Sequence, residues 1–591
     1  MHDFLIGNHQ IDKHLKYLSK YGEGELYWGL GIENEVYLEF DKKIIVNENF
    51  FLNNHKAERY SVNYFKNYKD NKYLEEAFLF YLNEYLKKKK DKDQKDNNII
   101  LPFLINSHSF SKTDKNNNAT KLYTTKNEDN PKFNGKLLLD EIIENNKYLK
   151  ESMNYNWLFD GDTIEFTTNN FYKAKLDDVF EELYNNKKLF IDNLNDVFIQ
   201  KEIFQKYGQV KFMEENYPFT IYLTNSNNIS MFNNGTLNYN ITLPTELDEN
   251  GKIKNKKKFI EEHSRAIKII QWMEPFILAV YGAPDPFSLM EKFSNKDKFS
   301  KSSQRCAVSR YISIGTYNCD KMEPGKILVK KVDELEWNKN NYWWFHEYYK
   351  DNAYKKLDII GMDINFNKHF SHGIELRFFD HIVDEKDLEK SFEFIIYLMD
   401  YILSVNPEKI DNFKCSSESK VWNKFVVNTL KYGKKYELNA IEKKIYESIF
   451  DIKIYKNSVE DIYEEIFLNL LIKFNYLCNS LSDNEFNKEE NSNYMLIPRG
   501  KFSSLTLNIQ HFEKNNLDNL DNLDNKIKKE DRIIIENEII KENEIIEENE
   551  IINGVFRKLQ TPASPLTEQA LQGSAENRII YNINNKCCII S

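Results

Sequence analysis

Glutamates recur at alternate positions in the segment GLGIENEVYLEF, residues 29–40. Glu33, Glu35 and Glu39 fall on one parity, and Asn34 is the single polar residue on the other parity. This alternation predicts a half-buried strand with three carboxylates on one face. Like charges about 7 Å apart along a strand repel one another, and burial strengthens the repulsion. A divalent cation such as Mg2+ would offset that charge, because it prefers oxygen ligands.

Three further segments repeat the pattern of one apolar face and one polar face. The polar faces carry Thr163, Glu165 and Thr167 in residues 159–171, Thr236, Asn238, Asn240 and Thr242 in residues 234–245, and Glu375 and Arg377 in residues 371–381. If the four strands share a sheet, these faces form one wall of a cleft that could hold hard divalent cations. An arginine two residues from a metal-binding glutamate suits a phosphate that bridges protein and metal. Glutamates, a hard metal and an arginine together favour phosphoryl transfer from a nucleotide.

Each of these pieces has a plainer interpretation when it is taken alone. A Glu-x-Glu pair is usually the solvated face of an antiparallel sheet. A Glu-x-Arg pair is usually a surface ion pair of small stabilising value. Asn238 and Asn240 could simply be polar residues that flank a turn. The combination of all of them in one chain favours a site.

The elements that must position these residues are strands mixed with long amphipathic helices. Helices are predicted for the stretches of residues 259–286, ended by Gly282 and Pro284, 385–405 and 459–481. The expected fold class is α+β, with one globular domain over residues 1–510 of the 591-residue chain.

From about residue 511 the sequence becomes repetitive, with three-residue (NLDNLDNLDN) and six-residue (ENEIIKENEIIEENEII) repeats. Neither period matches a heptad, which disfavours a long coiled coil. Residues 511–553 are therefore predicted to be a disordered or loosely helical acidic linker, with a self-associating helix as the alternative. A flexible tail is expected over residues 554–591.

The charge and cysteine content narrow the class of protein. The formal net charge of −11 argues against a general nucleic-acid binder, which would present a basic surface. The cysteines include no C-x-x-C pair that would indicate structural zinc, and four of the six stand isolated, as in a reducing compartment. The N-terminus lacks a signal-peptide core and no apolar run approaches 18 residues, so the expected location is cytoplasmic.

The order of the polar strands resembles the glutamine synthetase-fold carboxylate–amine ligases, particularly the glutamate–cysteine ligase branch and its phage and large-virus relatives. The resemblance spans roughly residues 25–385 and is carried by GIENE (31–35), DGDTIEFTT (160–168), NYNITLP (238–244), VYGAPDP (280–286), SQRCAVSRYISIGTY (303–317) and GIELRFFD (373–380). It implies a curved antiparallel sheet with helices packed behind it. It also implies ATP as a substrate, Mg2+ (with Mn2+ as an alternative) as the metal, and a small-molecule or peptide carboxylate and an amine as the other substrates. Homo-oligomers occur among such ligases, and the sequence leaves this open.

The resemblance also assigns roles to residues of this chain. It places Glu33, Glu35, Glu165 and Glu375 on the metal and Arg377 on the phosphates. Asn240 stands at the asparagine of a His-x-Asn strand and is assigned to cofactor binding. Either Arg305 or Arg310 would contact phosphate or substrate from a loop, and Arg377, Glu375 and Arg310 would be the catalytic groups. Asn238 stands where the family has a metal-binding histidine, and its carboxamide oxygen favours Mg2+ over softer metals.

The last four residues, Cys588-Ile-Ile-Ser, fit a C-a-a-X prenylation motif, and Cys587 could carry a second lipid. Membrane attachment through this end, with the acidic linker as a tether, is therefore a second expectation. Two other functions stay open at this point. One is a guanidino-type phosphotransferase on the same fold, and the other is a catalytically inactive, membrane-tethered interaction module.

Overall fold

A six-stranded antiparallel sheet is the central element of the computed structural model, and its strands follow the order β14-β15-β11-β1-β7-β6. Its strands are β1 (Tyr27–Val36), β6 (Trp157–Asp160), β7 (Thr163–Thr167), β11 (Thr236–Thr245), β14 (Ile364–Phe366) and β15 (Ile374–Asp380). The structure describes residues 27–47, 98–111, 137–161, 163–169, 176–200, 202–217, 219–223, 229–231, 235–245, 253–283, 317–324, 364–366, 373–416 and 419–480. All of them belong to a first unit, Met1–Phe502. The predicted linker and tail lie outside the described residues.

Long helices accompany this sheet, and three of them match the helices predicted from the sequence. The described helices are α5 (Ser107–Ser111), α6 (Leu138–Asn145), α7 (Lys147–Ser152), α8 (Asp177–Ile199), α9 (Glu202–Tyr207), α10 (Lys256–Tyr281), α14 (Glu385–Ser404), α15 (Pro407–Asp411), α16 (Lys420–Tyr432), η6 (Gly433–Lys435), α17 (Ala440–Phe450) and α18 (Val459–Ser480). α10 ends at Gly282, as predicted, and Asn255 caps its first turn by accepting a hydrogen bond from the Lys258 backbone N–H. The α+β class, with a large antiparallel sheet and helices, is confirmed.

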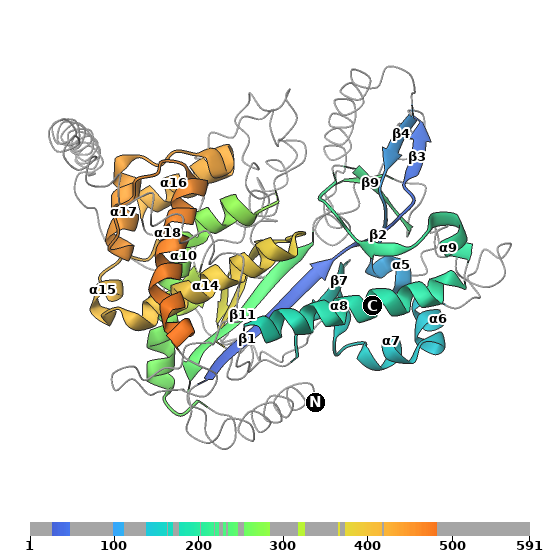
Figure 1. Ribbon diagram of the computed structural model, residues 1–591, viewed down its shortest axis with the longest axis horizontal. Helices are drawn as coiled ribbons and strands as arrows, with labels where there is room; N and C mark the ends of the chain where they lie inside the picture. The colour runs from blue at the N-terminus through green and yellow to red at the C-terminus, as the bar shows by residue number, and fades with distance from the viewer. Residues whose placement is uncertain are drawn as a thin grey trace, which may run out of the picture. The chain divides into compact units, whose positions relative to one another are not determined.

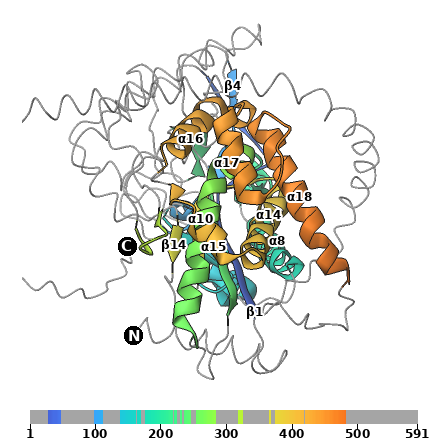
Figure 2. The same cartoon turned by 90° about the vertical axis from the view of Figure 1, so that its left-hand side faces the viewer.

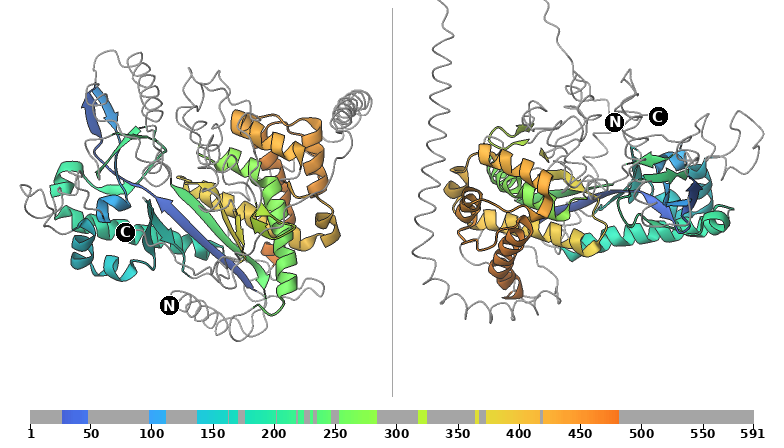
Figure 3. Two further views of the ribbon diagram at one scale, coloured as in Figure 1. Left: turned by 180° about the vertical axis from the view of Figure 1, so that it is seen from behind. Right: turned by 90° about the horizontal axis from the view of Figure 1, so that it is seen from above.

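The apolar face of the sheet packs against α8, α10 and α14. Tyr239 of β11 stacks on Phe392 of α14, with ring centroids 4.3 Å apart. Phe166 of β7 meets Phe190 of α8 edge to face at 5.1 Å. Figures 1 and 3 show α8 running along this side of β1 and β7, and in Figure 2 α14, α16 and α18 gather around α10. Helices on one face leave the polar residues of the strands on the other face.

A second, five-stranded sheet has the order β10-β9-β5-β2-β8. Its strands are β2 (Leu38–Phe40), β5 (Phe103–Ile105), β8 (Val210–Phe212), β9 (Phe219–Tyr222) and β10 (Ser230–Met231), and two short pairs, β3 (Ile44–Asn47) with β4 (Asn98–Leu101) and β12 (Tyr317–Asn318) with β13 (Glu323–Pro324), stand apart. β2 follows β1 after one residue, Tyr37, so the chain passes directly from one sheet to the other.

This passage corrects the prediction of a single strand with three carboxylates on one face. Glu39 lies in the second sheet and is fully buried. It accepts hydrogen bonds from the Tyr217 hydroxyl at 2.7 Å and the Lys43 ammonium at 3.0 Å, and the Lys211 ammonium lies 3.5 Å away. Its charge is therefore balanced by lysines, and Glu33 and Glu35 remain as the acidic pair of β1.

None of the described helices contains an apolar segment long enough to cross a membrane.

Candidate metal and phosphate site

The four polar strands predicted from the sequence are neighbours in the six-stranded sheet. Glu33 lies opposite Asn238, and Glu35 lies opposite Thr236 on one side and Glu165 on the other. Asn240 lies opposite Glu375. Directly opposite residues point to the same face of a sheet, so these side chains share one surface.

This surface is largely withdrawn from water. Glu165 and Asn240 are each 8% exposed, Glu375 is 3% exposed and Asn238 is 2% exposed. A solvated sheet face would leave such side chains open to water. The burial therefore excludes the plainer interpretation for these four residues.

Glu33 is held by two amides of β11. Asn240 Nδ2 donates to Glu33 Oε1 at 3.1 Å, and Asn238 Nδ2 donates to Glu33 Oε2 at 3.3 Å. Asn238 Oδ1 is buried and has no hydrogen-bond partner among the described residues. Because a buried amide oxygen without a partner costs free energy, this atom is the kind that a bound cation satisfies.

Three carboxylates converge beside Glu33. Oxygen atoms of Glu35, Asp160 and Glu165 lie within 4.8 Å of one another, close enough to bind one cation. Asp160 ends β6, and the turn of Gly161, at φ 56°, leads into β7. Thr163 Oγ1 donates to the Asp160 carbonyl at 2.7 Å and fixes this hairpin.

The carboxylate of Glu375 is bound by one amide and one guanidinium. Asn365 Nδ2 donates to Glu375 Oε2 at 2.7 Å, and Arg377 Nη1 donates to Glu375 Oε1 at 2.6 Å. Burial alone would lower the pKa of Arg377, but the charges of Glu375, Glu33 and Glu35 outweigh it and raise the pKa above its usual value. Arg377 is thus a permanent cation facing the acidic surface.

Asn34 is the polar exception on the apolar face of β1, and its hydrogen bonds explain why it lies there. Its Oδ1 accepts a hydrogen bond from Lys187 Nζ of α8 at 3.1 Å, and its Nδ2 donates to His381 Nδ1 at 3.1 Å and to the Thr236 carbonyl at 3.2 Å. Burial lowers the pKa of Lys187 to about 8, and burial together with the charge of Lys187 lowers that of His381 to about 3. This buried network fixes the backbone of β1 between Glu33 and Glu35.

The donor set on this surface fits a hard divalent cation. All of the candidate ligands are oxygens, and a carboxamide at Asn238 suits Mg2+ or Mn2+ better than a softer metal. Glu35, Asp160 and Glu165 would be the ligands, together with Glu33 and Asn238 of the neighbouring positions, and Glu375 lies at the far end of the same surface.

Two residues of this surface, Asp160 and Asn365, were not among the predicted site residues. Asp160 belongs to the D-G-D-T hairpin turn, whose turn chemistry was a usable signal. Asn365 stands in a three-residue strand that carries no detectable period. The predicted residues Arg305, Arg310, Cys587 and Cys588 lie outside the described residues.

No protein-family model matches the chain. It is 37% identical over 418 residues to a protein of Acanthamoeba polyphaga mimivirus named Uncharacterized protein R704, which covers 71% of this chain and 69% of the viral protein. Identity at this level over more than two thirds of both chains shows common descent. The chain belongs to the family of the mimivirus protein R704.

Proposed function

We propose that this protein is an ATP- and Mg2+-dependent carboxylate–amine ligase that forms an amide bond through an acyl phosphate. One observation carries the proposal. Strands far apart in sequence bring Glu33, Glu165 and Glu375 onto one surface, on which Glu165 and Glu375 are buried. The same strand that supplies Glu375 supplies a bound arginine, Arg377. These motifs also follow one another along the chain in the order that resembles the carboxylate–amine ligases.

The reaction explains why a protein would gather these groups. A carboxylate oxygen of the substrate attacks the γ-phosphorus of ATP, and ADP leaves. The nitrogen of the amine then attacks the carbonyl carbon of the acyl phosphate, phosphate leaves, and the nitrogen releases a proton. Both steps bring together anionic groups that repel one another, so the site needs positive charge.

The residues of this chain divide that task. Arg377 would bind the transferred phosphoryl group, because a guanidinium matches the geometry of phosphate oxygens. Glu375 would orient Arg377 through the 2.6 Å hydrogen bond. A cation held by Glu35, Asp160 and Glu165, with Asn238 beside them, would offset phosphate charge and orient the phosphate chain.

The experiment uses the full chain with ATP, Mg2+, a panel of carboxylates and hydroxylamine as a general amine. An acyl phosphate would be trapped as a coloured hydroxamate, so the natural amine need not be known. We expect a signal that depends on one class of carboxylate. Glu375→Gln should lower it at least about 100-fold, because Arg377 loses the carboxylate that orients it, and losing a group's stabilisation of transition-state charge usually costs that much.

Glu39→Gln is the matched control. It removes a buried carboxylate charge from the strand that continues β1, but its partners are Tyr217, Lys43 and Lys211 rather than the site. This variant should keep the hydroxamate signal. If ADP forms with guanidino compounds and no hydroxamate forms with any carboxylate, the activity is that of a phosphotransferase and not of a ligase. Equal hydroxamate signals in Glu375→Gln and the wild type would overturn the assignment of the site.

A further inference from the structure

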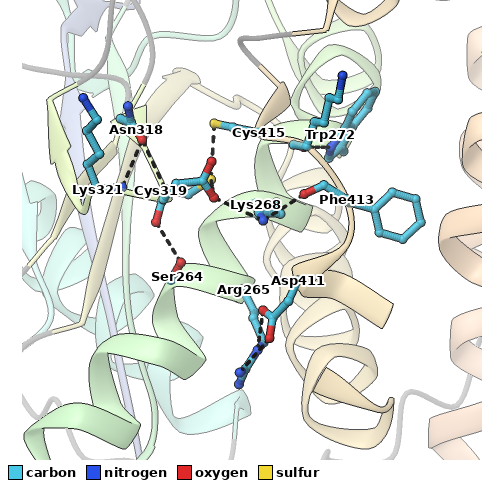
Figure 4. A network of polar contacts seen from close by, with 12 residues as sticks. Ser264, Arg265, Lys268, Trp272, Asn318, Cys319, Lys321, Asp411, Phe413 and Cys415 are labelled. Atoms are coloured by element: carbon cyan, nitrogen blue, oxygen red, sulfur yellow. Dashed lines mark hydrogen bonds and ion pairs between the residues drawn. The ribbon is translucent and has the colours of Figure 1, made fainter. Parts of the chain in front are cut away.

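A second group of metal-ligating side chains lies outside the sheet, where two segments meet on α10. Cys319 Sγ lies 3.3 Å from Cys415 Sγ, although the residues are 96 positions apart. Asp320 completes the group, because its carboxylate and the two sulfurs lie within 4.8 Å of one another. Both cysteines are buried and neither forms a disulfide. Figure 4 shows Cys319 of the β12–β13 hairpin facing Cys415 of the segment that joins α15 to α16.

Side chains along one stripe of α10 hold both segments by their backbone carbonyls. Ser264 Oγ donates to the Cys319 carbonyl at 2.7 Å, and Gln271 Nε2 donates to the Tyr317 carbonyl at 2.7 Å. On the other segment, Lys268 Nζ donates to the Phe413 carbonyl at 2.9 Å, and Trp272 Nε1 donates to the Lys414 carbonyl at 3.2 Å. The helix thus holds the backbone of both cysteine segments in place before any ligand binds, as a selective site requires.

The charge around the group suits a divalent metal. In the metal-bound form, two thiolates and one carboxylate would carry three negative charges, and a divalent ion would leave one. Lys268, only 5% exposed, places its ammonium 3.2 Å from Asp320 Oδ1 and would balance that last charge. It would also orient the carboxylate, as an outer-shell partner of a metal ligand does.

We infer that Cys319, Cys415 and Asp320 form a zinc site that fastens the β12–β13 hairpin to the segment before α16. Zinc binds thiolate sulfur at about 2.3 Å, which in tetrahedral geometry separates two sulfurs by roughly 3.8 Å. The observed 3.3 Å is within a small side-chain adjustment of that value. The Asp320 side chain is 50% exposed, so water can take the fourth position. A site of two thiolates is soft and differs in kind from the all-oxygen surface of the sheet.

The test is substitution of cobalt in the full chain, because thiolate–Co2+ bonds absorb in the near ultraviolet and carboxylate ligands do not. The reduced, metal-stripped protein is titrated with Co2+ and then with Zn2+. We expect one equivalent of Co2+ to produce the thiolate band and one equivalent of Zn2+ to remove it. The wild type should also retain about one zinc per chain after gel filtration.

Variants separate ligation from folding. Cys319→Ser and Cys415→Ser should each lose most of the band and weaken zinc binding at least 100-fold, while Asp320→Asn should keep the band with weaker affinity. Arg265→Met, which removes an ion pair between α10 and Asp411 but neither a ligand nor a hydrogen bond to a cysteine backbone, should keep the band and the zinc stoichiometry. The far-ultraviolet circular dichroism of every variant should match that of the wild type.

Two results would overturn the zinc site. One is a wild-type protein that, once reduced, shows no thiolate band with Co2+ and retains no zinc. The same negative result is expected if the two thiols serve only to form a disulfide in air. The other is a band that is equally strong in Cys415→Ser, because the sulfurs involved would then lie elsewhere.

Discussion

Glu35 of β1 and Glu165 of β7 lie directly opposite one another in the antiparallel ladder, with their side chains on the same face of the sheet. Like charges in directly opposite positions destabilise a sheet, and burial increases the cost. Asp160 adds a third carboxylate to the same place. A cation bound by these three carboxylates would offset their mutual repulsion.

The opposed carboxylates of Glu35 and Glu165 predict that Mg2+ raises the thermal stability of the protein. Adding Mg2+ should raise the melting temperature of the wild type, because a ligand that binds the folded state stabilises it. Glu165→Gln should lose most of that increase, since it removes one of the two opposed carboxylates. Thermal unfolding in EDTA and in Mg2+ measures both. Glu39→Gln serves as the control, and an identical Mg2+ response in Glu165→Gln and the wild type would argue against the cation.

Asn238 tests the same site from the neighbouring strand. Asn238→Leu keeps the size of the side chain but removes the buried oxygen that has no partner and the hydrogen bond to Glu33. We expect the unfolding free energy in EDTA to change by no more than about 1 kcal/mol. The affinity for Mg2+ or Mn2+ should fall about tenfold, as when one oxygen ligand is lost. Unchanged metal affinity in this variant, measured by calorimetry, would remove Asn238 from the ligand set.

Asn238→His offers a gain-of-function version of this test. An imidazole favours softer divalent metals than a carboxamide oxygen does. The variant should therefore bind Mn2+ or Co2+ more tightly relative to Mg2+ than the wild type. Competition titrations in the same buffer would give the ratio, and an unaltered ratio would count against a metal at this position.

His263 of α10 predicts a pH dependence of stability. Its Nε2 accepts a hydrogen bond from the Leu243 backbone N–H at 3.0 Å, and its Nδ1 donates to the Phe259 carbonyl. Burial lowers its pKa from 6.5 to about 4, so between these values the unfolded chain binds more protons than the folded one. Stability should therefore fall as the pH drops from 6.5 towards 4, by up to about 3 kcal/mol from this residue.

The comparison variant is His263→Gln, which cannot titrate in this range. The difference in unfolding free energy between wild type and variant should be constant above pH 6.5 and shrink below it. His381 contributes a similar loss to both proteins, because its pKa is lowered to about 3. A difference that stayed constant from pH 7.5 to 4.5 would mean that His263 is not held neutral.

Gly235 predicts a steric requirement at the edge of the site. A Cβ at this position would lie 2.0 Å from the backbone oxygen of Glu35. Gly235→Ala must therefore push β1 away from β11, and we expect a loss of at least about 3 kcal/mol or failure to fold. Gly161→Ala is the matched control, because nothing lies within 4 Å of its Cβ and only its φ of 56° opposes the change. That variant should lose about 1 kcal/mol, and urea unfolding of the two variants would contradict the structure if their order were reversed.

The sequence predicted much of this fold because its signals were strong over long segments. The helices α10, α14 and α18 and the strands β1, β7, β11 and β15 all have sustained periods that match their structure. The prediction that was wrong is the placement of Glu39 on the same sheet face as Glu33 and Glu35. An extended chain keeps its period of two when it leaves one sheet for another, so alternation could not place this carboxylate.

Contacts between short or distant segments were equally invisible in the sequence. Asn365 belongs to a strand of three residues, too short for a recognisable period. Cys319 and Cys415 are 96 positions apart, and the strands β14 and β15 and the helices α14 and α15 lie between them in the chain. Such pairs arise from tertiary packing, which local patterns do not encode.

The most direct measurement is the binding of Mn2+ to the full chain in the presence of a non-hydrolysable ATP analogue. Binding is monitored through the decrease of the free Mn2+ signal in electron paramagnetic resonance. The central claim is that the buried acidic surface of the six-stranded sheet holds a cation that nucleotide phosphates share. It predicts Mn2+ binding that the analogue strengthens and Mg2+ displaces. The double variant Glu35→Gln/Glu165→Gln should abolish this binding, while Glu39→Gln should preserve it. Equal Mn2+ binding in the double variant and the wild type, or no binding in the wild type, would contradict the claim.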